Sequence, residues 1–293
     1  MTASTKFACL LIASFVFFTC FALGEDQNTY RLIHYPGSES TFPYAINTQG
    51  DVVGWYQLPP SGWPQGFLFS DGVYTTVDVP GAATTYAYGI NDAKHIVGFY
   101  QNGSIYHGFF FDGQSFTDID YPGGDYGSTF PVGINNNGQI IGWYAGTYNS
   151  RYGIHGFVLS NGQYTTLDAP GDFKYGSYLI GINNLGGVVG EAKMANTHVL
   201  GFRFGSGGAF RPINVPGPFD THPTGINDNG VIVGYYDAPP HEHCFTLVNG
   251  QFHRLTFPGG ASLLYCTGIN ASGQVVGWSE GGKFQGFLIT PGK

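Results

Sequence analysis

The sequence predicts an all-β protein, a six-bladed β-propeller built from four-stranded antiparallel blades. The first observation behind this prediction is a tripeptide, Gly-Ile-Asn or Ala-Ile-Asn, that occurs six times and ends at Asn47, Asn91, Asn135, Asn183, Asn227 and Asn270. Successive copies are 44, 44, 48, 44 and 43 residues apart, which is the length of one propeller blade. The second is the composition: 47 glycines, 17% aromatic and only 10% charged residues favour strands and turns over amphipathic helices.

Each repeat predicts four strands joined by tight turns. In the second repeat we expect strands at residues 85–90, 95–100, 107–111 and 115–121. The turn that starts at Asn91 follows an Asn-x-x-Gly pattern found in most copies, and Asp112-Gly113 is a strong hairpin signal. Because tight hairpins join antiparallel neighbours, the four strands of a blade should form a meander.

The second strand of every repeat carries two aliphatic residues followed by glycine, as in Ile96-Val97-Gly98. Neighbouring residues of a strand point to opposite faces, so both faces of this strand must be buried. Burial on both faces is expected when blades stack face to face. The glycine predicts a close approach of a neighbouring backbone.

The two ends of the chain predict how the ring closes. The sixth repeat stops after its third strand, at residues 286–289, and residues 30–37 match the fourth strand of other repeats, such as residues 116–123. An N-terminal strand that completes the last blade would leave no open sheet edge. Residues 25–293 are therefore predicted to form one propeller domain.

The first 24 residues predict a secretory signal peptide. Lys6 is their only charge before an apolar run from Phe7 to Leu23, and small residues precede the polar Glu25. An uncleaved membrane anchor is the alternative, because the run is about as long as a short transmembrane span. We expect a secreted or periplasmic protein that does not insert into the membrane after cleavage.

The charge balance excludes two classes of partner. The chain has 11 Lys and Arg against 19 Asp and Glu, a formal net charge of −8. Nucleic acids and anionic membranes require clustered positive charge, so neither is expected as a partner. No cofactor-binding motif is present, and we predict no cofactor.

Two cysteines remain after the predicted signal peptide, Cys244 and Cys266. An even number of cysteines in an oxidising compartment is consistent with a disulfide, which would here link the last two repeats. Two buried free thiols are the alternative.

The repeats resemble a known family. His107-Gly108-Phe109 and His155-Gly156-Phe157 follow the Gly-Ile-Asn and aliphatic-Gly elements at a fixed interval. In this they resemble the HAF-type extracellular repeats of secreted bacterial proteins, and the resemblance covers essentially the whole mature chain. It implies an extracellular location and no particular reaction. Gln65, Leu200 and Gln285 replace the histidine in other repeats, so this histidine is not expected to be catalytic.

The variable loops carry the candidate ligand-binding residues. In a meander, the loops joining strands two and three and the loops joining successive blades lie on one face of the disc, and a rigid scaffold with variable loops is a common place for binding. Exposed aromatic rings beside carboxylates suit sugars, because the apolar face of a sugar stacks on a ring. The alternative is that these aromatics only pack the loops. The candidates are Trp63, Tyr106, Tyr126, Tyr148, Tyr152, Tyr175 and Asp172.

Glu191 is the residue that most clearly breaks the repeat. It stands where the other copies carry Trp55, Phe99, Trp143, Tyr235 and Trp278. A desolvated carboxylate has a raised pKa and suits a general acid. Alternatively, Glu191 pairs with Lys193, Arg203 or Arg211 of the same blade.

Asp220 and His222 are the further candidate catalytic residues, a carboxylate and a histidine on the loop face.

His241 and His243 alternate along an extended strand and could share one metal ion. The spacing shows no third ligand for that metal, so no metal site is predicted.

The sequence therefore predicts a secreted binding or scaffold module that recognises an extracellular glycan or another cell-surface ligand through its variable loops. A polysaccharide lyase or hydrolase is the first alternative. A structural envelope protein with protein partners is the second.

Overall fold

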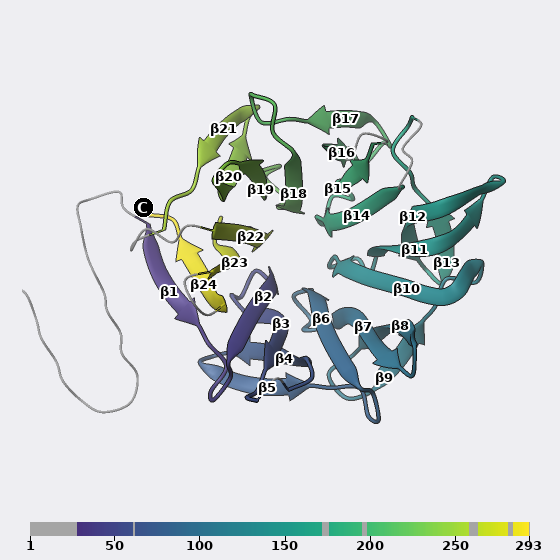
Figure 1. Cartoon of the computed structure of the whole chain (residues 1–293), viewed down its shortest axis with the longest axis horizontal. Coiled ribbons are helices and arrows are strands. Elements are labelled where there is room, and N and C mark those ends of the chain that lie inside the picture. The colour runs from purple at the N-terminus through teal and green to yellow at the C-terminus, as the bar shows by residue number, and fades with distance from the viewer. Residues whose placement is uncertain are drawn as a thin grey trace, which may run out of the picture.

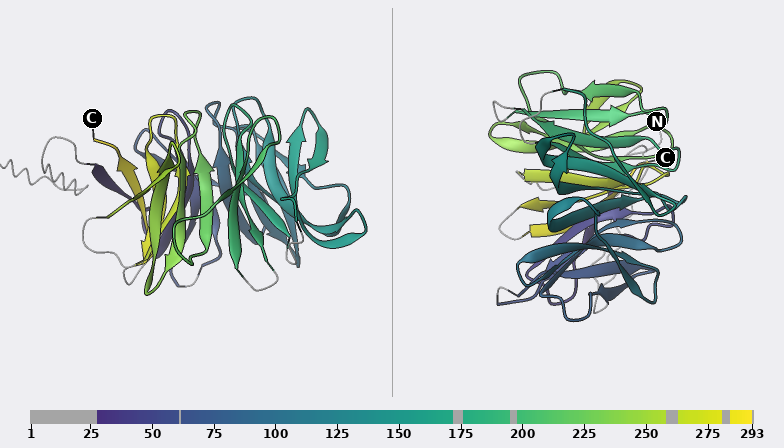
Figure 2. Two further views of the ribbon diagram at one scale, coloured as in Figure 1. Left: turned by 90° about the horizontal axis from the view of Figure 1, so that it is seen from above. Right: turned by 90° about the vertical axis from the view of Figure 1, so that its right-hand side faces the viewer.

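The computed structural model describes residues 28–60, 62–171, 176–194, 198–257, 263–280 and 284–292. These residues form six four-stranded antiparallel sheets arranged as blades around a central axis (Figure 1). Seen edge-on, the strands run between the two faces of a disc (Figure 2). The predicted six-bladed propeller is confirmed.

The strands of each blade follow one another outward from the axis (Figure 1). The innermost strands are β2 (Ser40–Ile46), β6 (Thr84–Ile90), β10 (Gly124–Ile134), β14 (Ser177–Ile182), β18 (Thr221–Ile226) and β22 (Leu263–Ile269). The second strands are β3 (Val52–Gln57), β7 (Ile96–Asn102), β11 (Ile140–Tyr148), β15 (Val188–Lys193), β19 (Ile232–Ala238) and β23 (Val275–Glu280). The third are β4 (Gln65–Ser70), β8 (Ile105–Phe111), β12 (Arg151–Ser160), β16 (Val199–Phe204), β20 (His241–Val248) and β24 (Phe284–Thr290). The outermost are β5 (Val73–Val77), β9 (Phe116–Ile119), β13 (Gln163–Thr166), β17 (Phe210–Ile213), β21 (Gln251–Arg254) and, in the last blade, β1 (Thr29–Ile33). We number the blades 1 to 6 in the order of their innermost strands.

The aliphatic pair of each second strand packs against two different neighbours. Ile96 and Val97 are both fully buried, and they belong to two separate hydrophobic clusters, one on each side of blade 2. The following Gly98 faces the inner strand, where an added Cβ would collide with the carbonyl oxygen of Tyr86. The predicted burial of both faces and the predicted close backbone approach are thereby confirmed in this blade.

Each innermost strand contains a bulge opposite this glycine. In blade 2, Ala87 pairs with Gly98 and Gly89 pairs with Val97, so Tyr88 is left between them. A bulge re-aims the extra residue, and the extra residue of every blade lines the central channel. These bulge residues are Tyr44, Tyr88, Val132, Ile180, Thr224 and Thr267.

The six repeated asparagines form a closed ring of hydrogen bonds at one end of the channel. The Nδ2 of each asparagine donates to the backbone oxygen of the equivalent asparagine in the next blade, at 3.0–3.3 Å, and Asn270 donates to Asn47 to complete the circle. The Oδ1 of each accepts the backbone N–H four residues later. Only a side chain with both a donor and an acceptor can close its own turn and join the next blade, which explains the repeated asparagine.

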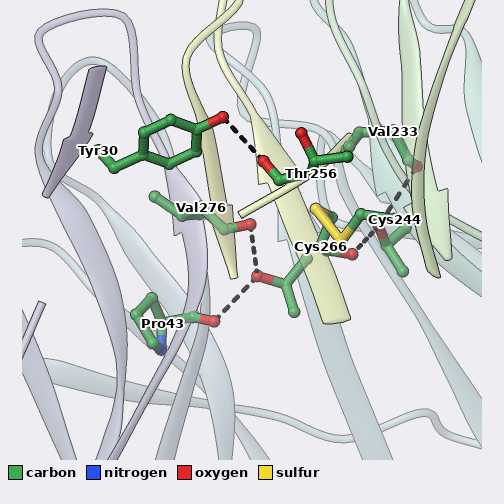
Figure 3. The surroundings of a disulfide bond; sticks show 9 residues. Tyr30, Pro43, Val233, Cys244, Thr256, Cys266 and Val276 are labelled. Carbon is green, nitrogen blue, oxygen red and sulfur yellow. Dashed lines mark hydrogen bonds between the residues drawn. A yellow bond between two sulfur atoms is a disulfide. The ribbon is translucent and has the colours of Figure 1, made fainter. Parts of the chain in front are cut away.

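The ring of blades is closed by β1. This strand pairs antiparallel with β24, from Thr29 opposite Thr290 to Ile33 opposite Gly286, and lies beside it in Figure 1. Ile33 is fully buried in the core shared with blade 1. The Tyr30 hydroxyl also donates to the backbone oxygen of Thr256 at 2.8 Å (Figure 3). The predicted closure by an N-terminal strand is confirmed.

Cys244 of β20 and Cys266 of β22 form a disulfide between blades 5 and 6 (Figure 3). Both cysteines are buried, and their Cα atoms are 5.5 Å apart. The predicted disulfide is therefore confirmed, and the alternative of two free thiols is wrong.

We expect the double variant Cys244→Ala/Cys266→Ala to have a free energy of unfolding about 3 kcal/mol lower, since the disulfide closes a loop with a sequence separation of 22. Denaturant unfolding with and without a reductant measures this. The reductant should destabilise the wild-type protein and leave the variant unchanged. Equal stability of the wild-type protein and the variant in the absence of reductant would contradict the prediction.

The predicted signal peptide, residues 1–24, lies outside the described residues. In the described part of the chain, no helix has the length and apolar character needed to cross a membrane.

Candidate functional site

Aromatic side chains form a belt around the channel, on the side of the bulge residues away from the asparagine ring. Within a blade, the residue after the second-strand glycine packs on its partner in the innermost strand with ring centroids 3.8–4.8 Å apart. These pairs are Phe42–Trp55, Tyr86–Phe99, Phe130–Trp143, His222–Tyr235 and Tyr265–Trp278. Between blades, the rings meet edge to face at 4.9–5.4 Å, in the pairs Trp55–Tyr86, Phe99–Phe130, Trp143–Tyr178, Tyr235–Tyr265 and Trp278–Phe42. We call these twelve positions, which include Glu191, the aromatic belt.

One junction of the aromatic belt is polar instead of aromatic. Between blades 4 and 5, the Nδ1 of His222 donates to the Oε2 of Glu191 at 2.7 Å. Both side chains are largely buried, with exposed fractions of 11% and 13%. The imidazole also stacks on Tyr235 with an interplanar angle of 10°. The pair thus replaces an edge-to-face contact without interrupting the belt.

Asp237 is a second carboxylate at this junction. Its Oδ2 lies 3.5 Å from the Nε2 of His222, a buried nitrogen that has no hydrogen-bond partner among the described residues. Burial favours the neutral imidazole, but the hydrogen bond and charge of Glu191 and the charge of Asp237 outweigh it and raise the pKa of His222. Burial raises the pKa of Asp237, and His222 partly offsets this rise. The junction therefore favours a protonated histidine between two carboxylates.

The sequence-based partners of Glu191 were wrong. Arg203 lies opposite Val189, two residues along β15 from Glu191, and Arg211 lies opposite Arg203 on the outermost strand, so neither is next to the carboxylate. The ammonium of Lys193 instead lies over the ring of Tyr178, 5.0 Å from its centroid.

The proposed pair of Asp220 with His222 is also not formed. The Oδ1 of Asp220 accepts from the Nδ1 of His198 at 2.9 Å. The structure thus brings together two of the three catalytic candidates, Glu191 and His222, and places Asp220 with a different histidine.

A central cavity of about 290 Å³ lies between the aromatic belt and the asparagine ring. Its wall consists of the bulge residues, the glycine (Ala45 in blade 1) and isoleucine that follow them, and Trp143, Tyr178 and Glu191 from the belt. Glu191 is the only charged residue among these described lining residues. The sequence could not show this lining, because the bulges that aim it inward follow from strand pairing.

A second pocket, of about 280 Å³, lies on the variable-loop face, between the hairpin of β11 and β12 and the connection from blade 3 to blade 4. The hairpin turns at Asn149 and Ser150, which both have positive φ angles of 49° and 66°, as a two-residue type I′ turn requires. Tyr148 and Arg151 flank this turn and line the pocket. We call this space the loop-face pocket.

A histidine–carboxylate pair forms part of the wall of the loop-face pocket. His155 Nδ1 donates to Asp168 Oδ2 at 2.7 Å, and Asp168 Oδ1 accepts the backbone N–H of Gly156. The ring of Tyr148 contacts His155 edge to face, with centroids 5.7 Å apart. The pocket thus combines an aromatic ring, a guanidinium and a fixed carboxylate within one blade.

The predicted loop aromatics have different environments. Trp63 and Tyr152 are the most exposed, at 71% and 60%, and Tyr148 is 38% exposed. Tyr106 is half-buried and packs on Phe99 and Phe130. This fits the alternative interpretation, in which the aromatic residue only packs its loop.

Three further candidates cannot be placed at the loop-face pocket. Asp172 and Tyr175 lie outside the described residues. Tyr126 lies in β10, and its side chain is outside the described part of the structure.

The two histidines considered for a metal lie on β20. His243 Nδ1 accepts from Arg254 at 3.0 Å, which occupies the lone pair that a metal would need. Burial and the charge of Arg254 lower the pKa of His243. Among the described residues, no group of three or more histidine, cysteine or carboxylate side chains could hold a metal ion.

The chain matches no protein family and no curated protein sequence. Solved structures share its fold. One is described as a candidate gluconolactonase, with 12% identity over 91% of this chain and 94% of that chain and a TM-score of 0.52. Another is the Aleuria aurantia lectin in complex with Fucα1-6GlcNAc, with 12% identity over 87% and 98% and a TM-score of 0.51. A third is the Trypanosoma rangeli sialidase, with 8% identity over 89% and 59% and a TM-score of 0.54. At these identities the similarity shows the fold alone, and the HAF-type assignment stays a prediction.

Proposed function

We propose that this protein is a secreted, HAF-type repeat protein that binds an extracellular glycan at the loop-face pocket. The observation that carries the proposal is the placement of Tyr148, Arg151 and Asp168 around one pocket of about 280 Å³. Tyr152 is exposed on the same hairpin but does not line this pocket. Export through the predicted signal peptide, residues 1–24, is part of the proposal. The disulfide between blades 5 and 6 is compatible with an oxidising compartment.

The chemistry of the loop-face pocket suits a sugar ring. The apolar face of a pyranose stacks on tyrosine, and its hydroxyls donate to carboxylates and accept from guanidinium groups. Asp168 is held by His155 and by a backbone N–H, so its position is fixed before a ligand arrives. A pre-positioned acceptor reduces the entropy lost on binding.

The comparison with solved structures supports the proposal in a general way. A lectin with the same fold binds Fucα1-6GlcNAc, so a propeller of this size can present a sugar site. The low identity gives no residue correspondence, and the proposed site rests on the residues of this chain.

We expect Tyr148→Ala to weaken glycan binding at the loop-face pocket about tenfold, or about 1.4 kcal/mol, through loss of stacking. A panel of plant, algal and bacterial polysaccharides, assayed by retention, first identifies the ligand. Leu185→Ala is the control, because Leu185 is also exposed, at 64%, but lies in a turn on the opposite face. An equal loss in the control, or none in Tyr148→Ala, would refute this site.

A polysaccharide lyase or hydrolase is the second candidate function. It is favoured by the Glu191–His222 hydrogen bond of 2.7 Å beside the central cavity. Mass spectrometry of the same incubations distinguishes the two functions: released oligosaccharides that disappear in Glu191→Gln would indicate an enzyme. Retention without products supports the binding module. The absence of both retention and products would favour a structural protein.

A further inference from the structure

The central cavity is separate from the loop-face pocket and has a different chemistry. The loop-face pocket is lined by Arg151, His155 and Asp168. The central cavity is lined by four aromatic rings, aliphatic side chains, two threonines and one carboxylate. The rings are those of Tyr44, Tyr88, Trp143 and Tyr178.

Both threonine hydroxyls of the cavity wall are already hydrogen-bonded, and one oxygen of Glu191 is not. Thr224 Oγ1 donates to the backbone oxygen of Cys266 at 2.7 Å, and Thr267 Oγ1 donates to that of Pro43 at 2.9 Å (Figure 3). Glu191 uses its Oε2 for His222. Its Oε1 has no hydrogen-bond partner among the described residues, and this leaves one carboxylate oxygen available to a ligand.

Glu191 is the one charged group that faces the cavity among the described lining residues. His222 supplies a positive charge when protonated, but Asp237 lies on its other nitrogen and shares that charge. Lys193 lies over the ring of Tyr178, two residues along β15 toward the variable-loop face, and is not part of the cavity wall. An ammonium group thus already contacts the belt next to Glu191, from outside the cavity.

We propose that the central cavity binds a small ligand carrying a primary or quaternary ammonium group, whose cation lies against Glu191 and the rings of Trp143 and Tyr178. The proposal is independent of the proposed glycan site. Ammonium groups are attracted by aromatic rings and form charge-assisted hydrogen bonds or ion pairs with carboxylates. The volume of about 290 Å³ is near the lower limit of small-molecule sites, so the ligand is about the size of choline or a monosaccharide.

Neutral and anionic ligands of the same size fit the wall less well. A neutral sugar would bury many hydroxyls against a wall that is mostly aromatic rings, glycines and aliphatic side chains, and unpaired buried hydroxyls cost free energy. An anion would be repelled by Glu191, and the lining offers no Lys or Arg to bind it. The expected order of affinity is choline and glucosamine first, glucose next and gluconate last.

Isothermal titration calorimetry with these four compounds tests the proposal. We expect choline and glucosamine to bind at least about tenfold more tightly than glucose, and gluconate not to bind. Glu191→Gln keeps the side-chain volume and an acceptor for His222, and should lose this preference. Tyr148→Ala, at the loop-face pocket, should bind choline like the wild-type protein. No binding of either amine, equal binding by Glu191→Gln, or loss of choline binding in Tyr148→Ala would overturn the proposal.

A second measurement needs no variant and remains informative if Glu191→Gln fails to fold. In isoleucine-methyl NMR of the wild-type protein, choline should shift the signals of Ile180 and Ile226, which line the cavity. Ile33, buried in the outermost strand of blade 6, should not shift. Shifts confined to isoleucines away from the cavity would place the amine elsewhere and overturn the proposal.

Discussion

Replacing His222 with alanine is expected to lower the free energy of unfolding by about 3 kcal/mol, because it leaves the largely buried carboxylate of Glu191 without its partner. Glu191 would lose its hydrogen bond of 2.7 Å and Asp237 its neighbouring cation. The stacking of the imidazole on Tyr235 would also disappear. Denaturant unfolding at neutral pH measures the effect.

A double variant distinguishes the charge effect from a simple loss of volume. Phe99 and Phe130 form the equivalent junction between blades 2 and 3, edge to face at 4.9 Å. Glu191→Phe with His222→Phe copies that junction, and replacing a buried ion pair by packed apolar residues is often neutral or stabilising. We expect the double variant to be at least about 2 kcal/mol more stable than His222→Ala. Equal instability of the two would show that the unpaired carboxylates are not the cause.

The loss of stability caused by His222→Ala should depend on pH in a defined direction. Burial alone would lower the pKa of His222, but Glu191 and Asp237 outweigh burial and raise this pKa above its usual value of 6.5. A group with a raised pKa in the folded state contributes its full stabilisation below the unfolded value, and this is lost as the pH rises through the folded value. The difference in stability between wild type and His222→Ala should therefore narrow from pH 6 to pH 9. A difference that widens over this range would contradict a raised pKa.

Most of the fold could be predicted because it depends on patterns within one repeat. In blade 2, the strands predicted at residues 85–90, 95–100, 107–111 and 115–121 are found as β6 to β9, with ends that differ by at most two residues. Hairpin signals such as Asp112-Gly113 set these positions locally. The closure by β1 could be predicted because one strand was missing at one end of the chain and present at the other.

Contacts between blades could not be predicted in the same way. The role of Asn47 and its equivalents in their own turns follows from the sequence, but the hydrogen bond from Asn47 to the oxygen of Asn91 depends on how neighbouring blades meet. The bulge at Tyr88 depends on strand pairing. A local pattern contains neither kind of information.

The hydrogen-bond partner of Glu191 also depends on how neighbouring blades meet, although the sequence contains an indication of it. The pattern within one repeat predicts a cation of blade 4 as this partner, whereas the actual partner, His222, lies 31 residues away in blade 5. The equivalents of His222 in the other blades are all aromatic: Phe42, Tyr86, Phe130, Tyr178 and Tyr265. Two polar exceptions at neighbouring belt positions, one in each of two adjacent blades, indicate a pair once the ring is known.

Deleting residues 28–34, which include β1, is expected to abolish the cooperative unfolding transition of the propeller. Without β1, the edge of β24 would have unpaired backbone groups from Gly286 to Thr290, and an open edge promotes aggregation. The fully buried Ile33 would be lost from the core shared with blade 1. Size-exclusion chromatography and thermal unfolding measure the result; a monomer with a wild-type transition would contradict it.

A matched pair of point variants within β1 separates the loss of packing from the loss of strand pairing. Ile33→Ala should cost about 2–5 kcal/mol, as for other large-to-small substitutions in a core. Leu32→Ala, one residue earlier, should change stability by less than about 0.5 kcal/mol, since Leu32 is 56% exposed. The disulfide Cys244–Cys266 ties β22 of blade 6 covalently to blade 5. The main chain runs from β1 into β2 of blade 1, so only non-covalent contacts, the pairing of β1 with β24 and bonds such as Asn270 with Asn47, hold β24 to β1 and blade 1. The seam beside β1 is thus where the ring should open first, and Ile33→Ala should accelerate hydrogen exchange in β2 and β24 before it does so in β20.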